Sequence, residues 1–243
     1  MLELLWNDPI NQTNMAKYIE ACELAAGDRV LDVGCGCGEV LIRLHQRYRI
    51  EGIGIDFSAP HIAEAKRRVA KFSADSSLKL IEIDATEFEV EPNSFDLVVC
   101  LGASHAFGLG SDAYQNAIAN MIPMVRPGGK ILIAEGYARQ PAAPEYRKLL
   151  GDSTPDDATH AANVATGERL GLIALGAWTS SKDEWDDFEW TYQRIIERNA
   201  EQQPDDDSAQ SKLAQRREWI HAYLRWGRDT LGYGIYLFQL PKR

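Results

Sequence analysis

The chain has 243 residues, of which 45% are hydrophobic and 26% charged, a composition typical of a globular protein with a sizeable core. The formal net charge of −10 argues against affinity based on phosphate contacts with nucleic acid. The sequence has neither a membrane-length apolar run nor a basic leader, so we expect a cytoplasmic protein with no membrane partner.

The four cysteines are Cys22, Cys35, Cys37 and Cys100. The Cys35-x-Cys37 pair does not have zinc-site spacing, and no second Cys or His pair lies near it in sequence. We therefore expect reduced thiols that pack in the core, and no metal site.

The first half of the chain predicts a parallel sheet. Residues 11–24 have the pattern of an amphipathic helix. Short β-rich apolar runs then alternate with longer helix-period segments, which is typical of strands joined by helices. The expected strands are 29–34, 50–56, 78–84, 95–102 and 129–136, and the last is preceded by a turn at RPGGK. The expected helices are 39–48, a segment that begins after Ser58, and 112–125.

The second half of the chain has longer helical segments. A helix near 156–169 leads to a sixth strand over 171–181, and a seventh strand is expected over 233–240. The roughly 50 residues between these strands predict two helices, 183–201 and 208–230, separated by the turn QQPDDDS.

The stretch VLDVGCGCGEV, residues 30–40, places a glycine-rich turn between a strand and a helix. Glycine recurs at this place in nucleotide-binding α/β folds because the backbone must approach the ligand closely. The dinucleotide fingerprint requires a small residue at the position that Glu39 occupies here. A glutamate there would also bring negative charge near a pyrophosphate, which weakens the dinucleotide interpretation.

The pattern Asp32-x-Gly34-x-Gly36-x-Gly38 resembles motif I of the class I S-adenosylmethionine (SAM)-dependent methyltransferases. SAM has no phosphate, and its amino and sulfonium groups are cationic. The resemblance implies that Asp32 lies near these groups, directly or through water. It also implies that the homocysteine part of SAM lies against the open glycine turn.

Further candidate cofactor residues stand where the following strands end, which is where a doubly wound sheet binds its ligands. Asp56 ends the second strand, with Phe57 after it, and a carboxylate here can accept hydrogen bonds from both ribose hydroxyls of SAM or NAD. The resemblance implies that Asp84 accepts from the adenine amino group and that the amide of Ala85 meets a ring nitrogen. It also implies that Leu101, at the end of the fourth strand, lies against the cofactor. Asp56 and Asp84 are alternatively turn or cap residues.

The resemblance extends over almost the whole chain, to a largely uncharacterised bacterial subgroup of these enzymes. The shared features are CLGASHAFG near the fourth strand, Glu135-Gly136-Tyr137 after the fifth, Trp185-Asp186-x-x-Glu189, and PDDD at 204–207. Some relatives have an aromatic residue where this chain has Ala138. These features identify a subgroup and not a substrate.

The family fold is a doubly wound, Rossmann-like sheet of seven mostly parallel strands, with the seventh strand antiparallel between the fifth and the sixth. An insertion before the seventh strand then emerges at the ligand-binding edge. We therefore expect a SAM-binding core over 29–182 and 231–243, a helical cap over 183–230, and an N-terminal helical segment over 1–28. In similar enzymes the N-terminal helix closes over the cofactor, here with Met15 or Tyr18.

The resemblance implies transfer of a methyl group from SAM to a small-molecule acceptor beneath the cap. Methyl transfer depends mainly on alignment, although oxygen and nitrogen acceptors can require a base, for which His105 is the best candidate. Glu135 and Tyr137 are secondary candidates that would shape the pocket. His45 and His61 lie in the expected helices that flank the cofactor-binding half of the sheet, and we expect them to be structural. Cap tryptophans are candidates for substrate contact or for packing: Trp185, Trp190, Trp219 and Trp226.

Three alternative functions remain open from the sequence. A SAM-binding sensor would bind SAM tightly without turnover. A nucleic-acid methyltransferase would be expected to carry an N/D-P-P-Y/F motif after the fourth strand, where this chain has CLGASHAF. An NAD-dependent oxidoreductase is disfavoured by Glu39 and by the lack of a Tyr-x-x-x-Lys set. The sequence predicts neither the acceptor nor the oligomeric state.

Overall fold

The computed structural model describes residues 4–72, 77–151 and 155–242, and within them one seven-stranded sheet with the order β3-β2-β1-β4-β5-β7-β6. The strands are β1 (Arg29–Val33), β2 (Glu51–Asp56), β3 (Leu78–Glu82), β4 (Phe95–Leu101), β5 (Val125–Ala138), β6 (Ile173–Thr179) and β7 (Leu231–Gln239). β7 is antiparallel to both β5 and β6, whereas the first five strands are parallel. The predicted fold class, a doubly wound and mostly parallel sheet, is confirmed.

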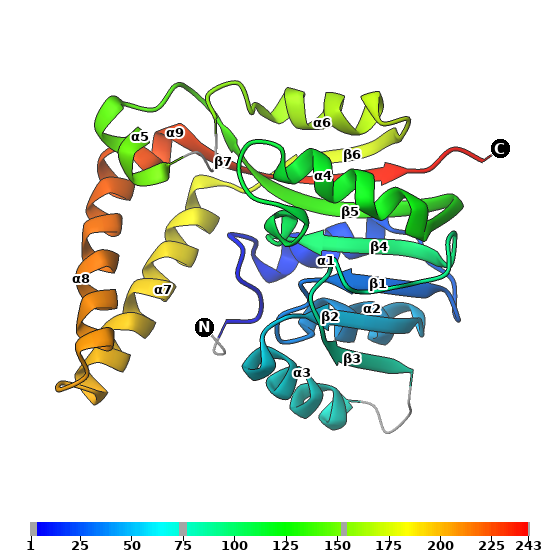
Figure 1. Ribbon diagram of the computed structural model, residues 1–243, viewed down its shortest axis with the longest axis horizontal. Coiled ribbons are helices and arrows are strands. Elements are labelled where there is room, and N and C mark those ends of the chain that lie inside the picture. The colour runs from blue at the N-terminus through cyan, green and yellow to red at the C-terminus, as the bar shows by residue number, and fades with distance from the viewer. Residues whose placement is uncertain (1–3, 73–76, 152–154, 243) are drawn as a thin grey trace.

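Helices cover both faces of the sheet (Figure 1). They are α1 (Gln12–Ala21), α2 (Glu39–Tyr48), α3 (Ala59–Phe72), α4 (Ala113–Met121), α5 (Pro144–Leu150), α6 (His160–Arg169), α7 (Lys182–Gln202), α8 (Asp207–Ala222) and α9 (Arg228–Thr230). α1 and α2 pack on one side of the sheet, around Met15, Leu41 and Leu132. α4 and α6 pack on the other side, around Ile118 and Ile133. Strand residues buried on both faces account for the continuous apolar runs in the sequence.

The strands predicted from the sequence all form, with differences at their ends. β5 begins at Val125, earlier than predicted, because the RPGG segment is taken into the strand as an irregularity opposite residues 95–97 of β4. The helix predicted near 156–169 begins only at His160, where the side chain of Thr159 accepts a hydrogen bond from the amide of Ala162. The last predicted helix ends as α8 at Ala222 and continues as a π-helical turn, Tyr223–Gly227.

α7 and α8 form a helical pair beyond the edge at which the parallel strands end (Figure 1). A buried ion pair joins them, with Arg216 Nη2 2.6 Å from Glu189 Oε2. Asp186 accepts from the hydroxyl of Tyr223 at 2.7 Å and forms an ion pair with Arg228. The Asp and Glu of the WD-x-x-E feature therefore stabilise the helical pair.

The pair is also tied to the N-terminal part of the chain. Glu184 of α7 accepts from the backbone amide of Asn11 at 2.9 Å and from the side chain of Asn14 at 2.8 Å. Its other oxygen closes a capping box with Ser181.

None of the helices in the described residues has the length and apolar character that a membrane span requires.

Candidate active site

The glycine turn after β1 lies beside the topological switch between β1 and β4, where doubly wound sheets bind ligands. Gly34, Gly36 and Gly38 all have positive φ, of 69°, 52° and 75°. A Cβ on Gly34 would lie 2.3 Å from the Cβ of Ala103, whereas a Cβ on Gly36 would meet nothing within 4 Å. Gly34 is therefore required for packing against the end of β4, and Gly36 faces open space.

Asp56 joins the end of β2 to this turn. Its Oδ2 accepts from the amide of Gly36 at 2.9 Å, and its Oδ1 accepts from the amide of Ser58 at 2.8 Å. The side chain is buried, and His61 of α3 lies 4.0 Å from Oδ1. One carboxylate thus fixes the geometry of the glycine turn while its remaining lone pairs stay available to a ligand.

Asp32, on β1, has a buried oxygen without a partner. The residue is 3% exposed, and its Oδ2 has no hydrogen-bond partner among the described residues. Burial, together with the nearby carboxylates of Asp56 and Asp8, raises the pKa of Asp32 to about 8. A buried, unpartnered carboxylate is costly, so this position is suited to a cationic group that arrives with a ligand.

These residues line a cavity of about 340 Å³, which we call the cofactor cavity. The site residues predicted from the sequence that line this cavity are Asp32, Gly34, Gly36, Asp56, Phe57, Leu101 and His105. His61, expected to be structural, also lines it. Gly38 does not; a Cβ there would lie 3.2 Å from the Cβ of Ala65, so Gly38 serves the packing of α2 against α3.

Asp84 and Ala85 are not among the residues that line the cofactor cavity. The carboxylate of Asp84 is exposed and accepts from the amide and hydroxyl of Thr86, at 2.8 and 2.6 Å. These two hydrogen bonds lower the pKa of Asp84. Ala85 packs against the core. The adenine contacts expected of this pair stay predictions.

The segment before α1 forms part of the cavity wall, which the sequence did not indicate. Leu4, Trp6 and Asp8 line the cofactor cavity, whereas Met15 and Tyr18 of α1 are buried in the core. The expectation that Met15 or Tyr18 covers the cofactor is therefore wrong for these two residues, because the apolar face of α1 packs on the sheet.

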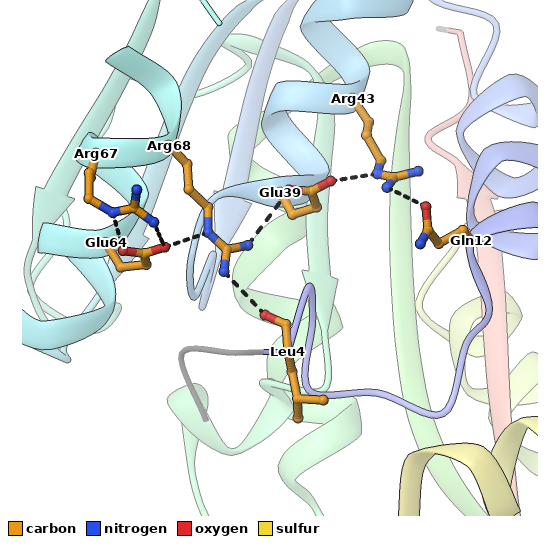
Figure 2. A network of polar contacts seen from close by, with 7 residues as sticks. All are labelled: Leu4, Gln12, Glu39, Arg43, Glu64, Arg67 and Arg68. Carbon is orange, nitrogen blue, oxygen red and sulfur yellow. Dashed lines mark hydrogen bonds and ion pairs between the residues drawn. The ribbon is translucent and has the colours of Figure 1, made fainter. Parts of the chain in front are cut away.

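Arginines of the flanking helices hold this segment in place (Figure 2). Arg68 of α3 lies between Glu39 and Glu64 and donates to the carbonyl of Leu4 at 3.5 Å. Arg43 of α2 lies over the ring of Trp6 at 5.0 Å. Glu39, the residue that disfavours a dinucleotide, is thus part of the ion-pair network that secures the N-terminal segment.

A second cavity, of about 660 Å³, adjoins the first, and we call it the acceptor cavity. Four residues line both cavities: Asn7, Asp8, Gly102 and His105. The acceptor cavity lies against Glu135 at the end of β5, Tyr233 at the start of β7, and Trp185 and Phe188 of α7. His105 is exposed within the turn η1 (Ser104–Phe107).

Apart from Trp185, the other expected residues lie outside the acceptor cavity. Tyr137 is buried, with its ring 5.3 Å from that of His160. His45 is also buried, with its Nδ1 2.8 Å from the carbonyl of Ile50, as expected of a structural residue.

Of the four tryptophans in residues 183–230, only Trp185 lines the acceptor cavity. Trp219 donates a hydrogen bond to Glu189, Trp226 stacks on Tyr146 at 5.9 Å between ring centroids, and Trp190 is 40% exposed.

All four cysteines are buried, free thiols. The described residues contain no cluster able to hold a metal ion.

The chain resembles known methyltransferases in sequence and in structure. Residues 30–129 match the model of a methyltransferase domain. The uncharacterised protein YjhP of Escherichia coli is 29% identical over 232 residues, which cover 95% of this chain and 92% of YjhP. The demethylmenaquinone methyltransferase of Oceanobacillus iheyensis is 34% identical over 126 residues, and the match spans 51% of this chain and 50% of that enzyme.

A solved SAM-dependent methyltransferase from Geobacter sulfurreducens, in complex with S-adenosyl-L-homocysteine (SAH), superposes with a TM-score of 0.88. It is 29% identical, and the match covers 97% of this chain and 94% of that chain. The cofactor of this protein is SAM. The buried Oδ2 of Asp32 suits the cationic amino group of SAM. The open space at Gly36 would let SAM lie close to the backbone. The chain therefore carries a methyltransferase domain over residues 30–129, and it is an enzyme similar to SAM-dependent methyltransferases over nearly its whole length.

Proposed function

We propose that this enzyme transfers the methyl group of SAM to a small-molecule acceptor held in the acceptor cavity. The observation that carries the proposal is the junction of the two cavities at Asn7, Asp8, Gly102 and His105. A methyl group can pass directly between two ligands only where their sites meet. Trp185 and Phe188 of α7 also line the acceptor cavity, which favours an enclosed, small acceptor.

In the cofactor cavity, we assign Asp32 to the amino group of SAM and Asp56 to its ribose hydroxyls. Gly34, Gly36 and Leu101 would leave the backbone free to approach the cofactor. Phe57 is 74% exposed at the cavity rim, where an adenine ring could cover it. Support for these assignments is the shared cavity and the hydrogen-bonding capacity that remains at Asp32 and Asp56.

At the junction, the residues of this chain would orient the acceptor and exclude water. SAM supplies a methyl group bonded to a sulfonium, which is a good leaving group. Alignment of the acceptor atom therefore provides much of the acceleration. His105 borders both cavities and is the proposed base for an acceptor that must lose a proton.

The proposed organisation is a SAM-binding core over 29–182 and 231–243, an N-terminal helical segment over 1–28, of which residues 4–8 line the cofactor cavity, and a cap over 183–230 that covers the acceptor. Trp185 and Phe188 of the cap line the acceptor cavity, which supports this division. We propose no nucleic-acid or membrane partner, and the cytoplasmic location stays a prediction.

The test is the formation of SAH from SAM with matched acceptor panels. Purified protein would be incubated with small amines, phenols, carboxylic acids and thiols in one set, and with duplex DNA or structured RNA in another. Turnover with small molecules alone supports the proposal. Turnover with nucleic acid alone would contradict it, as would SAM binding without turnover in any set. The variant Asp56→Ala, which removes the proposed ribose contact, provides the background rate.

A further inference from the structure

We propose that the methyl acceptor is a small apolar amine, whose nitrogen lies between Asp8 and Glu135 and whose apolar part lies against Trp185 and Phe188. This inference rests on the proposed function and specifies its substrate class. It depends on the charge, burial and remaining hydrogen-bonding capacity of the groups that line the acceptor cavity.

Asp8 provides a buried carboxylate at the junction of the two cavities. The residue is 6% exposed, and its Oδ1 accepts from the hydroxyl of Tyr233. Its Oδ2 accepts no hydrogen bond from any described residue, and no described cationic side chain pairs with it. Buried carboxylates are normally paired. A ligand cation in the cavity would supply the missing partner.

Glu135 provides a second carboxylate from the end of β5. Its Oε2 accepts from the hydroxyl of Ser104, and its Oε1 accepts from the amide of Gly136 at 3.0 Å. Both donors are neutral, so the charge of Glu135 is not balanced by the protein. Burial raises the pKa of Glu135 despite these hydrogen bonds. The site therefore contains two acids that would both gain from a cation.

The other charged groups of the cavity do not compensate Asp8 and Glu135. Arg169 lines the cavity from the exposed end of α6, where it donates to the hydroxyl of Thr166 at 2.8 Å. Two exposed acids that also line the cavity, Asp112 and Asp157, add further negative charge. A carboxylate or phosphate on the acceptor would be repelled at the inner end, which makes an anionic acceptor the least suitable.

The aromatic side chains of the cavity suit the apolar part of such a cation. Trp185 lies edge-to-face with Tyr233, at 6.3 Å between ring centroids, and its indole N–H has no hydrogen-bond partner in the described part of the chain. Tyr233 in turn holds Asp8. The aromatic wall and the carboxylate therefore form one continuous surface, and aromatic faces attract organic cations as well as apolar groups.

An amine also fits the movement of charge in the reaction. The ammonium first loses one proton, through His105 or water, which frees the nitrogen lone pair. The new carbon–nitrogen bond forms from this pair as the carbon–sulfur bond breaks, and the sulfur of SAH keeps the bonding electrons. One positive charge thus leaves the cofactor cavity and appears on the methylated nitrogen. Asp8 borders both cavities and can stabilise this charge throughout.

The first test uses calorimetric titration of SAH-loaded protein with three probes that share one skeleton. They are 2-phenylethylamine, the neutral 2-phenylethanol and the anionic 3-phenylpropanoate. We expect the amine to bind roughly tenfold more tightly than the alcohol, as one charge-assisted contact would give, and the anion to bind least. Asp8→Asn and Glu135→Gln should each remove most of the preference for the amine. Glu201→Gln, an exposed acid of α7 outside the cavity, is the matched control and should leave it unchanged.

A second readout is methyl transfer to amines, alcohols and carboxylic acids of matched skeleton, measured as SAH formed from SAM. Turnover confined to amines supports the inference. Turnover or binding that favours the alcohol or the acid would overturn it while leaving the proposed function intact. Failure of every amine to bind protein that is saturated with SAH would overturn it as well. Absence of SAH binding would instead contradict the proposed function itself.

Discussion

The carboxylate of Asp56 accepts a hydrogen bond from the backbone amide of Gly36, at 2.9 Å between Oδ2 and N. The end of β2 therefore holds the glycine turn that follows β1. Two features that look independent in the sequence, a glycine motif and an acid 20 residues later, form one structural unit. The same carboxylate fixes the turn and is the group that we propose to bind the ribose of the cofactor.

Asp56→Ala should weaken SAM binding severely without unfolding the protein. The change removes the proposed ribose contacts and releases the amides of Gly36 and Ser58. Two hydrogen bonds to a charged group together contribute about 3 kcal/mol or more, which corresponds to a loss of affinity of roughly 100-fold. Calorimetric titration with SAH, with circular dichroism as the control for folding, measures the effect. Unchanged affinity would contradict the proposed contact.

Asp32→Asn should stabilise the ligand-free protein while it weakens SAM binding. Burial raises the pKa of Asp32 from 3.8 to about 8, so between these values the folded chain retains a proton that the unfolded chain releases. Stability therefore falls as pH rises from about 4 to 8. Asparagine has no such dependence.

The gain from Asp32→Asn should accordingly be small near pH 4 and largest near pH 8. A gain of about 2 kcal/mol would raise Tm by about 4–8 °C in a domain of this size. Thermal melts at several pH values would measure it. A variant that is less stable than the parent at pH 8 would show that Asp32 has a partner in the ligand-free protein.

Binding of SAH near pH 7 should release protons. In the free protein Asp32, with a pKa of about 8, is mostly protonated at this pH. The cationic amino group of SAH would favour the ionised carboxylate, so roughly one proton leaves on binding. Calorimetry in buffers with different ionisation enthalpies counts the protons. Heats that do not depend on the buffer would contradict the proposed pairing of Asp32 with the amino group.

His105→Ala should preserve SAM affinity and slow methyl transfer by about 100-fold or more, the range expected for loss of a general base. His221→Ala is the matched control, since His221 is exposed on α8 and lines neither the cofactor cavity nor the acceptor cavity. Steady-state rates of SAH formation across pH would compare the two. Full activity in His105→Ala would exclude it as the base.

Glu189→Gln should destabilise the helical pair of α7 and α8. Glu189 is 2% exposed and pairs with Arg216, which is 8% exposed. Removal of one partner leaves a buried charge, at a cost of about 3–5 kcal/mol. Denaturant unfolding would measure this loss, and the double variant Glu189→Met/Arg216→Met should recover much of it. An unaltered midpoint in the single variant would show that the pair contributes little.

The sequence predicted the strands of the sheet and the glycine turn because these depend on local patterns, whereas the place of the seventh strand between the fifth and the sixth came from the family resemblance. Asp32 and Asp56 were also predictable, since each stands at a fixed place relative to a strand end. Asp8 was not, because it lies before the first helix and its contact with Tyr233, at the other end of the chain, leaves no local pattern in the sequence. Of the four cap tryptophans, Trp185 alone reaches the acceptor cavity, and helical spacing does not reveal which face of α7 turns inward.

The most direct test of this account is a crystal structure of the protein with SAH bound. We predict that its amino group contacts Asp32, that its ribose contacts Asp56, and that its sulfur faces Gly102 and His105 where the two cavities meet. A sulfur atom that points away from the acceptor cavity, or SAH bound outside the cofactor cavity, would contradict the proposed path of methyl transfer.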